Sequence, residues 1–214
     1  MKNIKLLLVA LVLFSVCKTS FGQFTFGGKL GVNMSNLVTE ESTDLKSKLG
    51  MDIGLYSEFG LNDKFAFQLA LTRNEKGAKA EEGDVKIKSQ LSYFEVQPSL
   101  IYFHKIKSTT LYASAGPYYA FFATGQLKAN KKMFGLDGNS KTESISMGSD
   151  DNDQFKSTDY GLNLSLGLNL KDNGRIGIQY ELGLANISNA DNSEVKNKSV
   201  SIFITYPYTF GKKN

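Results

Sequence analysis

The sequence is poor in the residues on which disulfide scaffolds, metal sites and histidine-based catalysis depend. Its 214 residues include one cysteine, Cys17, one histidine, His104, and no tryptophan. A single cysteine excludes an internal disulfide, and neither a Cys/His metal spacing nor a glycine-rich phosphate loop occurs. His104 has no obvious Ser or Cys partner, so we expect a solvated turn residue. We therefore predict a protein without a cofactor and without enzymatic activity, although hydrolases and acyltransferases built on β-barrels exist.

Long hydrophobic runs are confined to the start of the chain. Residues 1–22 combine two early lysines with an apolar run from Leu6 to Phe14 and small residues at positions 20 and 22. This arrangement predicts a signal peptide over 1–22, cut before Gln23, rather than a buried N-terminal helix. Acylation of Cys17 is an alternative that the bulky Val16 disfavours. The remaining residues, 23–214, form a single predicted domain.

Charge and composition narrow the class of the exported product. Loss of the three lysines of segment 1–22 lowers the formal net charge from +4 to +1. No basic cluster that indicates nucleic-acid binding remains. After residue 22 no run approaches the ~20 apolar residues of a membrane helix. An exported chain with neither disulfides nor such a helix is either a soluble periplasmic protein or a β-barrel.

Alternation of apolar and polar residues predicts eight β-strands. They are expected at 24–36, 48–60, 65–73, 89–103, 110–123, 157–170, 175–187 and 199–210. Most match or exceed the roughly 9–11 residues that a tilted strand needs to cross a bilayer. Pro98, Pro117 and Pro207 fall inside these strands, where each removes a ladder donor, and for Pro207 we expect pairing to end near Tyr206.

The connections between these strands alternate between short and long. Turns 61–64, 104–109 and 171–174 are short, and the last contains the Asn-Gly pair that type I′ hairpins favour. Connections 37–47, 74–88, 124–156 and 188–198 are longer and are expected to be loops. Short turns on one side, long loops on the other and an even strand count are typical of an outer-membrane barrel. The predicted fold is an all-β, eight-stranded antiparallel up-and-down transmembrane barrel, with long extracellular loops and short periplasmic turns.

The side of the barrel on which the apolar residues lie separates this fold from a soluble lipocalin-like carrier. In segment 157–170 leucines alternate with Gly161, Asn163, Ser165, Gly167 and Asn169, which suit a crowded polar interior better than a solvated surface. Charged residues are absent from the middle of the apolar sides, as lipid contact requires. We therefore predict that the apolar side faces lipid. In a soluble carrier the same residues would point inward.

Tyrosines near the strand ends share the apolar side. Such rings form the aromatic girdles of membrane barrels, with the ring in lipid and the hydroxyl in water. The predicted girdle consists of Tyr102, Tyr119, Tyr160, Tyr180, Tyr206, Tyr208 and Phe210.

The polar side of the strands carries charges that should fill the lumen. An eight-stranded barrel is just wide enough to be filled by its own side chains. The predicted interior network comprises Lys29, Asp52, Tyr56, Glu58, Gln68, Glu95, Gln97, Arg175, Gln179 and Glu181. It sets four carboxylates against two cations, so we expect buried ion pairs, with a proton or cation path as the weaker alternative.

The expected loops offer one weak metal candidate. Asp150, Asp151 and Asp153 in the 124–156 loop could bind Ca²⁺, but the spacing lacks the glycine and the distal glutamate of an EF-hand. A solvated loop tip near divalent-bridged lipopolysaccharide is the favoured interpretation. The mixed charges of 74–88 indicate solubility alone.

Several segments resemble the PorT-like outer-membrane β-barrel domain family of Gram-negative bacteria. They are "GGKLGVNMSNL" (27–37), "YFEVQPSLIYF" (93–103), "LYASAGPYYAFF" (111–122), "FKSTDYGLNLSLGLNL" (155–170) and "IGIQYELGLANIS" (176–188). One departure is Pro98, which follows Gln97 where the family places proline directly after the Glu-aliphatic pair. The resemblance implies an eight-stranded barrel of the general size of small OmpA- or OmpX-type proteins. It implies little about activity, except that one branch of the family is linked to a protein-secretion system.

The function expected from these observations is non-enzymatic. We predict an integral outer-membrane protein with a structural, adhesive or binding role through its extracellular loops. The alternatives are an accessory component of a secretion or transport assembly, a small channel and a soluble lipocalin-like carrier. The expected partners are outer-membrane lipid, lipopolysaccharide, the barrel-assembly machinery during biogenesis and an envelope protein.

Overall fold

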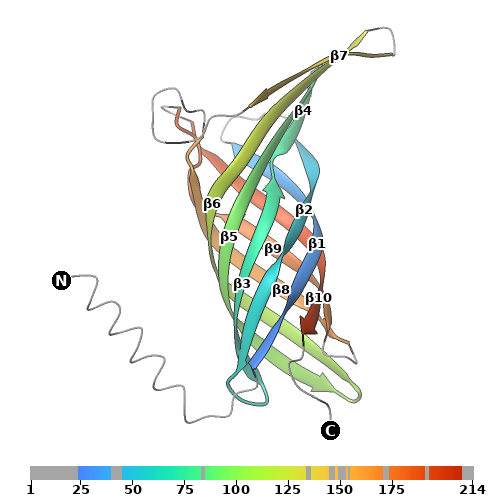
Figure 1. The fold of residues 1–214 in the computed structure, drawn as a ribbon, viewed down its shortest axis with the longest axis vertical. Coiled ribbons are helices and arrows are strands. Elements are labelled where there is room, and N and C mark those ends of the chain that lie inside the picture. Colours follow the sequence, from blue (N-terminus) through green and yellow to red (C-terminus); the bar gives the residue numbers. More distant parts are fainter. Residues whose placement is uncertain are drawn as a thin grey trace, which may run out of the picture.

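The structure is a computed structural model of the chain, and strands dominate it (Figure 1). It describes residues 24–39, 45–82, 85–133, 136–144, 148, 153, 155–170, 174–190 and 193–208. The predicted signal peptide and Phe210 lie outside these residues. Within them, no helix is long and apolar enough to cross a bilayer.

Eight antiparallel strands close into a ring. They are β1 (Phe24–Thr39), β2 (Lys46–Gly60), β3 (Phe65–Lys76), β5 (Val85–Ile106), β6 (Thr109–Met133), β8 (Thr158–Asn169), β9 (Arg175–Gly183) and β10 (Val195–Tyr208). Each strand pairs with the next in this order, and β10 pairs with β1 over 14 residues. The predicted eight-stranded antiparallel barrel is thus confirmed. The start of β1 and the end of β10 lie at the end of the ring that carries the short turns, which we call the near end; the opposite end is the far end (Figure 1).

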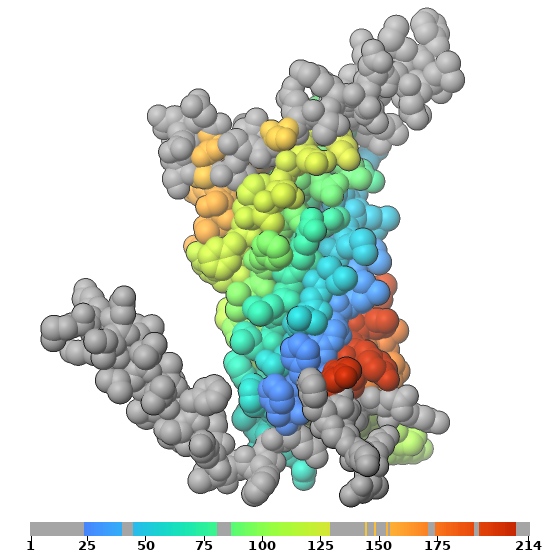
Figure 2. All heavy atoms as spheres, in the orientation of Figure 1, coloured from blue at the N-terminus to red at the C-terminus, as the bar shows by residue number. Residues whose placement is uncertain are grey.

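The alternation of each strand sorts its side chains between the lumen and the outer wall. In β8 the leucines are exposed while Gly161, Asn163 and Ser165 are buried. Three residues at mid-height on neighbouring strands, Leu164, Ile178 and Ile202, are 52%, 55% and 62% exposed. The apolar side therefore faces outward, which contradicts the soluble-carrier alternative. Figure 2 shows β1, β2, β3, β5 and β6 forming one continuous stretch of this outer wall.

Two further strands correct the prediction of long loops at 74–88 and 124–156. β4 (Ala78–Glu82) pairs with β2 and β5, and β7 (Leu136–Ser144) pairs with β6. β5 and β6 run for 22 and 25 residues, much longer than expected, and rise with β7 above the ring (Figure 1). Charged residues such as those of 74–88 are typical of loops, but strands that extend into water can carry lysines on both faces while their backbones stay paired.

The register explains two of the three prolines. The β5–β6 ladder runs from Val96↔Tyr119 to Leu100↔Ala115 with a gap between these pairs. Pro98 and Pro117 lie opposite each other in that gap, so the two missing backbone donors fall at one place. Each proline is paired on its other side, with Leu69 and Leu162. Pro207 corrects an expectation, since pairing with β1 continues through Pro207 to Tyr208.

Aromatic side chains on the outer wall gather at two heights. Toward the near end, Phe24 contacts Phe59, and Phe65 contacts Tyr102, at ring-centroid distances of 5.0 and 5.3 Å. Tyr206 and Tyr208 are exposed on β10 at this end. Toward the far end, Tyr119 packs on Phe121 at 4.8 Å and is paired with Tyr160. Tyr180 differs from the others, because it is half-buried and carries the ammonium of Lys198 over its ring at 5.7 Å.

Candidate functional site

The interior of the ring is the largest collection of chemically active side chains in the described part of the chain. Its charges form three groups that follow one another from the near end to the far end. The first is centred on Arg175, the second on Lys29 and the third on Lys76.

Arg175 and Glu58 form a bidentate ion pair near the short turns. Arg175 Nη1 and Nη2 donate to the two carboxylate oxygens of Glu58 at 2.6 and 2.7 Å. The guanidinium carbon also lies 5.1 Å from the ring centroid of Phe103 and 5.5 Å from that of Tyr112. β2 and β9 are thus joined across the lumen by a pair whose geometry only arginine supplies.

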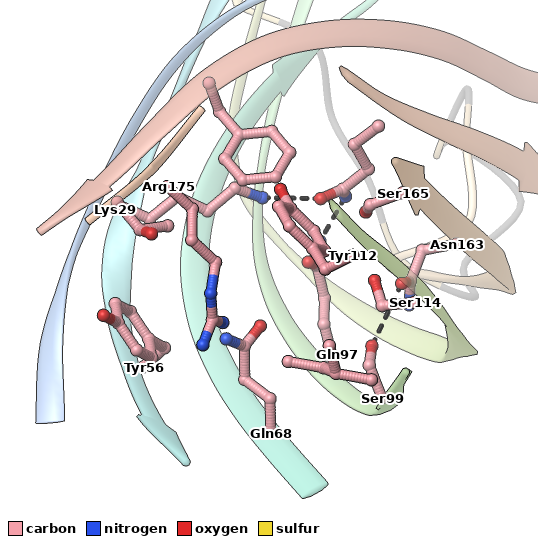
Figure 3. A pocket seen from close by; sticks show the side chains of 14 residues that line it. Lys29, Tyr56, Gln68, Gln97, Ser99, Tyr112, Ser114, Asn163, Ser165 and Arg175 are labelled. Carbon is pink, nitrogen blue, oxygen red and sulfur yellow. Dashed lines mark hydrogen bonds between the residues drawn. The ribbon is translucent and has the colours of Figure 1, made fainter. Parts of the chain in front are cut away.

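The side chain of Lys29 lies in the middle of the lumen, beside a small cavity. Its ammonium lies 2.7 Å from Asp52 and donates to Gln179 Oε1 at 2.8 Å, while Phe203 lies beneath it at 4.9 Å. The cavity below is about 20 Å³, room for one or two water molecules. Figure 3 shows Tyr56, Gln68, Gln97, Ser99, Tyr112, Ser114, Asn163 and Ser165 around it. Space of this size admits water and excludes a larger solute.

Lys76 lies at the centre of the third group. Its ammonium is 2.7 Å from Glu95, 3.1 Å from Glu181 and 3.5 Å from Asp159. The ring of Tyr118 lies 4.2 Å from the same nitrogen.

Amides and hydroxyls complete the hydrogen bonding of these carboxylates. Gln97 Nε2 donates to both Glu95 at 2.7 Å and Glu181 at 2.9 Å, and Asn74 Nδ2 donates to Glu181 at 3.0 Å. Asp159 accepts from the Tyr118 hydroxyl at 3.0 Å and from Asn197 Nδ2 at 2.9 Å. Three negative charges around one ammonium are stable in an apolar surrounding only with such donors.

An apolar cluster fills the lumen above Lys76. Its fully buried members include Leu91, Tyr93, Tyr118, Ala120 and Ile187. Leu37, Ala78, Ala185 and Val195 complete it, with Phe122 and Leu127 packed against its edge. Two layers of side chains therefore fill the lumen: an ion-paired network and, nearer the far end, an apolar cluster.

The structure places the predicted interior residues inside the ring and adds others. Nine of the ten are buried, and Gln68 is half-buried with its amide donating to Glu58 at 3.3 Å. The expected balance of four carboxylates against two cations is wrong, because Asp159, Lys48 and Lys76 are buried there as well. Lys76 lies in segment 74–88, which the sequence predicts to be a loop. The signal for it was the alternation of β3, which continues through Ala70, Thr72 and Asn74 to Lys76.

The other candidate residues lie away from this network. His104 is exposed and stacks on Tyr102 at 6.4 Å, but it lies in β5, paired with Leu111 of β6, and not in the turn that the sequence led us to expect, because β5 and β6 stay paired almost to the turn. Of the calcium candidates, Asp150 and Asp151 lie outside the described residues. Asp153 is half-buried, and its backbone oxygen accepts from Asn189 Nδ2 at 3.1 Å. Within the described residues no group of three His, Cys, Asp or Glu side chains is arranged to hold a metal ion.

Comparison with solved structures finds small outer-membrane proteins. Ail, the attachment invasion locus protein of Yersinia pestis, is 17% identical, with coverage of 87% of this chain and 99% of Ail and a TM-score of 0.45. Neisserial surface protein A is 15% identical, with coverage of 87% and 98% and a TM-score of 0.47. The outer membrane enzyme PagL is 14% identical, with coverage of 84% and 99% and a TM-score of 0.43.

Comparison of the sequence with family models gives a match that covers most of the chain. Residues 18–189 match the model described as outer membrane protein beta-barrel domain. A search of curated protein sequences finds no match. Small outer-membrane barrels of this kind are mostly non-enzymatic, PagL being an exception. With its closed eight-stranded ring and outward apolar wall, the chain belongs to the outer membrane protein β-barrel domain family and is a small β-barrel of the bacterial outer membrane.

Proposed function

We propose that the protein is a non-enzymatic binding protein that acts through the sheet at its far end. The observation that carries this proposal is the length of the β5–β6 pair. Its ladder continues beyond the outer-wall pair Phe94↔Phe121 to Val85↔Lys131. A membrane-crossing strand needs only about 9–11 residues, so the 22 and 25 residues of β5 and β6 leave a paired sheet standing outside the bilayer. A paired sheet offers a partner a more fixed surface than a loop does.

The filled lumen argues against the channel alternative. The ion pairs Lys76–Glu181 and Arg175–Glu58 and the hydrogen bond from Lys29 to Gln179 cross it, and the cavity beside Lys29 and Arg175 has room for only one or two water molecules. We expect purified protein in planar bilayers to give flat current traces. Stable unitary conductance steps that vanish without protein would contradict the proposal and favour a channel.

Site-specific cross-linking tests the binding role. The only native cysteine, Cys17, lies in the predicted signal peptide, so a mature chain with one engineered cysteine is labelled at one place. Gln126→Cys puts a photoreactive maleimide on an exposed position of the far-end sheet, and Lys64→Cys puts it in a near-end turn as the matched control. We expect cells to yield a specific adduct from Gln126→Cys only. The same adducts from both positions, or adducts from neither, would refute a far-end binding role.

A second function is favoured by the resemblance of segments 93–103 and 155–170 to the PorT-like family. We propose it as an accessory role in a secretion or transport assembly. In that case the Gln126→Cys adduct is an envelope protein of the same cell, and deletion of that protein removes the adduct. The barrel-assembly machinery is expected only as a transient adduct in newly made protein. A pulse-chase experiment separates the two kinds of adduct: if the labelled cells are chased before irradiation, the adduct with the assembly machinery is lost and the adduct with the envelope protein remains.

A further inference from the structure

The β-sheet register brings lysines into a row across the far-end sheet. Lys79 of β4 is directly opposite Lys88 of β5, and Lys88 is directly opposite Lys128 of β6. Lys46 of β2 is in turn opposite Lys79. The next pair outward, Glu81↔Lys86, is of opposite charge, so the row of like charges is confined to one level. We call Lys79, Lys88 and Lys128 the lysine row.

The lysine row lies on the outer wall. Leu91 is fully buried in the apolar cluster, and alternation from Leu91 places Ser89 inward and Lys88 outward. Directly paired residues share a face, so Lys79 and Lys128 point to the same side as Lys88. Lys128 is exposed, and Lys79 and Lys88 are half-exposed. The row thus continues the lipid-facing surface of β5 and β6 above the bilayer.

Like charges that stand directly opposite one another destabilise a sheet. Three such pairs follow one another here, Lys46↔Lys79, Lys79↔Lys88 and Lys88↔Lys128. None of the three residues of the lysine row forms an ion pair with a described residue. A further cation, Lys48, is within electrostatic reach of Lys79 and Lys88, and its buried ammonium has no hydrogen-bond partner among the described residues. Part of its charge is balanced by Glu75. A bound anion with several charges would remove this repulsion.

The position of the lysine row relative to the bilayer indicates which anion it can bind. Phe94 and Phe121 are exposed and directly paired, and outward aromatic rings mark the headgroup level of a barrel. Lys88 lies six residues beyond Phe94, which is about 20 Å along the strand at ~3.3 Å per residue. The row is therefore above the acyl chains, at the level of the saccharides of the surrounding outer leaflet.

We propose that the lysine row binds the phosphate groups on the saccharide part of lipopolysaccharide in the same membrane. Adjacent strands lie about 4.8 Å apart, so the three ammonium groups span about 10 Å and can meet phosphates on neighbouring sugars. A surface that faces sideways along the membrane is suited to a neighbouring lipid rather than to a soluble polymer arriving from outside. This inference rests on the proposed binding role of the far end and gives that role a ligand class.

Binding of lipopolysaccharide by the purified barrel tests the inference. The variant carries Lys79→Gln, Lys88→Gln and Lys128→Gln, and the matched control carries Lys64→Gln, Lys105→Gln and Lys107→Gln, which are exposed at the near end. Both lose three positive charges. Each is reconstituted in nanodiscs of uncharged lipid and titrated with fluorescent lipopolysaccharide, intact or enzymatically dephosphorylated. At about 1 kcal/mol per lysine near an anionic surface, removal of three lysines corresponds to a change in affinity of roughly 100-fold, so we expect the lysine-row variant to bind the intact form about 100-fold more weakly than wild type and control.

Several outcomes would overturn the inference. The first is equal binding of intact lipopolysaccharide by the two triple variants, and the second is equal binding of intact and dephosphorylated lipopolysaccharide by wild type. The third is a lysine-row variant that still binds lipopolysaccharide like wild type but no longer binds a sulfated polysaccharide. The last would make the occupant a soluble polyanion. Should the lysine row fail while Gln126→Cys still gives its adduct, only this inference falls and the proposed function stands.

A single substitution provides a second measurement that does not depend on the triple variant folding. Lys88→Gln removes the central charge and both like-charge contacts. Without lipopolysaccharide we expect it to raise the thermal unfolding midpoint, and with saturating intact lipopolysaccharide to show a smaller ligand-induced rise than wild type. A residue with only a structural role would change both conditions equally, and that result would contradict the inference.

Discussion

Lys76 is the residue on which the interior electrostatics depend most directly. It faces Glu95, Glu181 and Asp159 within 3.5 Å and is fully buried. Removing one partner of a buried ion pair leaves an uncompensated charge in a medium that solvates it poorly. Here the loss of one ammonium would expose three carboxylates to one another.

We expect Lys76→Met to destabilise the folded barrel by about 3–5 kcal/mol. Urea unfolding in lipid vesicles, followed by the heat-modifiable shift on SDS gels, measures this change. Lys64→Met, at an exposed turn position, is the control and should stay within about 0.5 kcal/mol of wild type. Adding Glu95→Gln and Glu181→Gln to Lys76→Met should recover part of the loss. No recovery would mean that the lysine acts through packing rather than charge.

At the scale of single elements, glycines on β8 and β9 let an aromatic ring lie against the backbone. Gly167 and Gly177 are directly paired, and both face the lumen. A Cβ atom at Gly167 would come within 2.7 Å of both the Tyr112 ring and the Cα of Gly177. Tyr112 in turn flanks the Arg175 guanidinium, so the two glycines indirectly support the Arg175–Glu58 pair.

Gly167→Ala is therefore expected to destabilise the barrel by about 1–3 kcal/mol, the usual cost of overpacking. Gly28→Ala is a matched control in β1, because its Cβ would meet only the Gly54 carbonyl oxygen, at 4.0 Å. The difference between the two urea midpoints measures the cost of the close contacts at Gly167, with the Ile176 carbonyl oxygen, the Gly177 Cα and the Tyr112 ring. A loss of similar size for both variants would show instead that any alanine in these strands is unfavourable.

The elements also show what the sequence allows one to predict. Period-two alternation found all eight ring strands, because lipid-facing and lumen-facing side chains differ in kind at almost every step. The alternation of β3 extends to Lys76, but alternation fails at Lys88 and Lys128, where strands leave the bilayer and both faces can be polar. There the backbone pairing, which sequence composition does not report, decides the structure. The partners of interior charges were equally out of reach, since ion pairs such as Lys76–Glu181 depend on strands that meet only across the closed ring.

At the scale of the whole molecule, the orientation of the wall should make tolerance of charge depend on depth. Leu164 lies in β8 and Leu170 directly follows that strand. Both side chains are on the outer face, with similar exposed fractions of 52% and 49%. Leu164 pairs with Tyr180 at mid-height, whereas Leu170 lies just past the end of β8 beside the near-end turn. An outward arginine costs about 2–4 kcal/mol at the bilayer midplane and about 0–1 kcal/mol near the interface.

We therefore expect Leu164→Arg to lower the free energy of unfolding in lipid vesicles by about 2–4 kcal/mol and Leu170→Arg by less than about 1 kcal/mol. In detergent micelles, where no fixed bilayer midplane exists, the gap between the two variants should shrink. If it persists unchanged in micelles, the cost comes from side-chain packing and not from depth in lipid. Because both variants add the same charge to the same face, only the surroundings of the outer wall differ, and the comparison measures how deeply this barrel sits in its membrane.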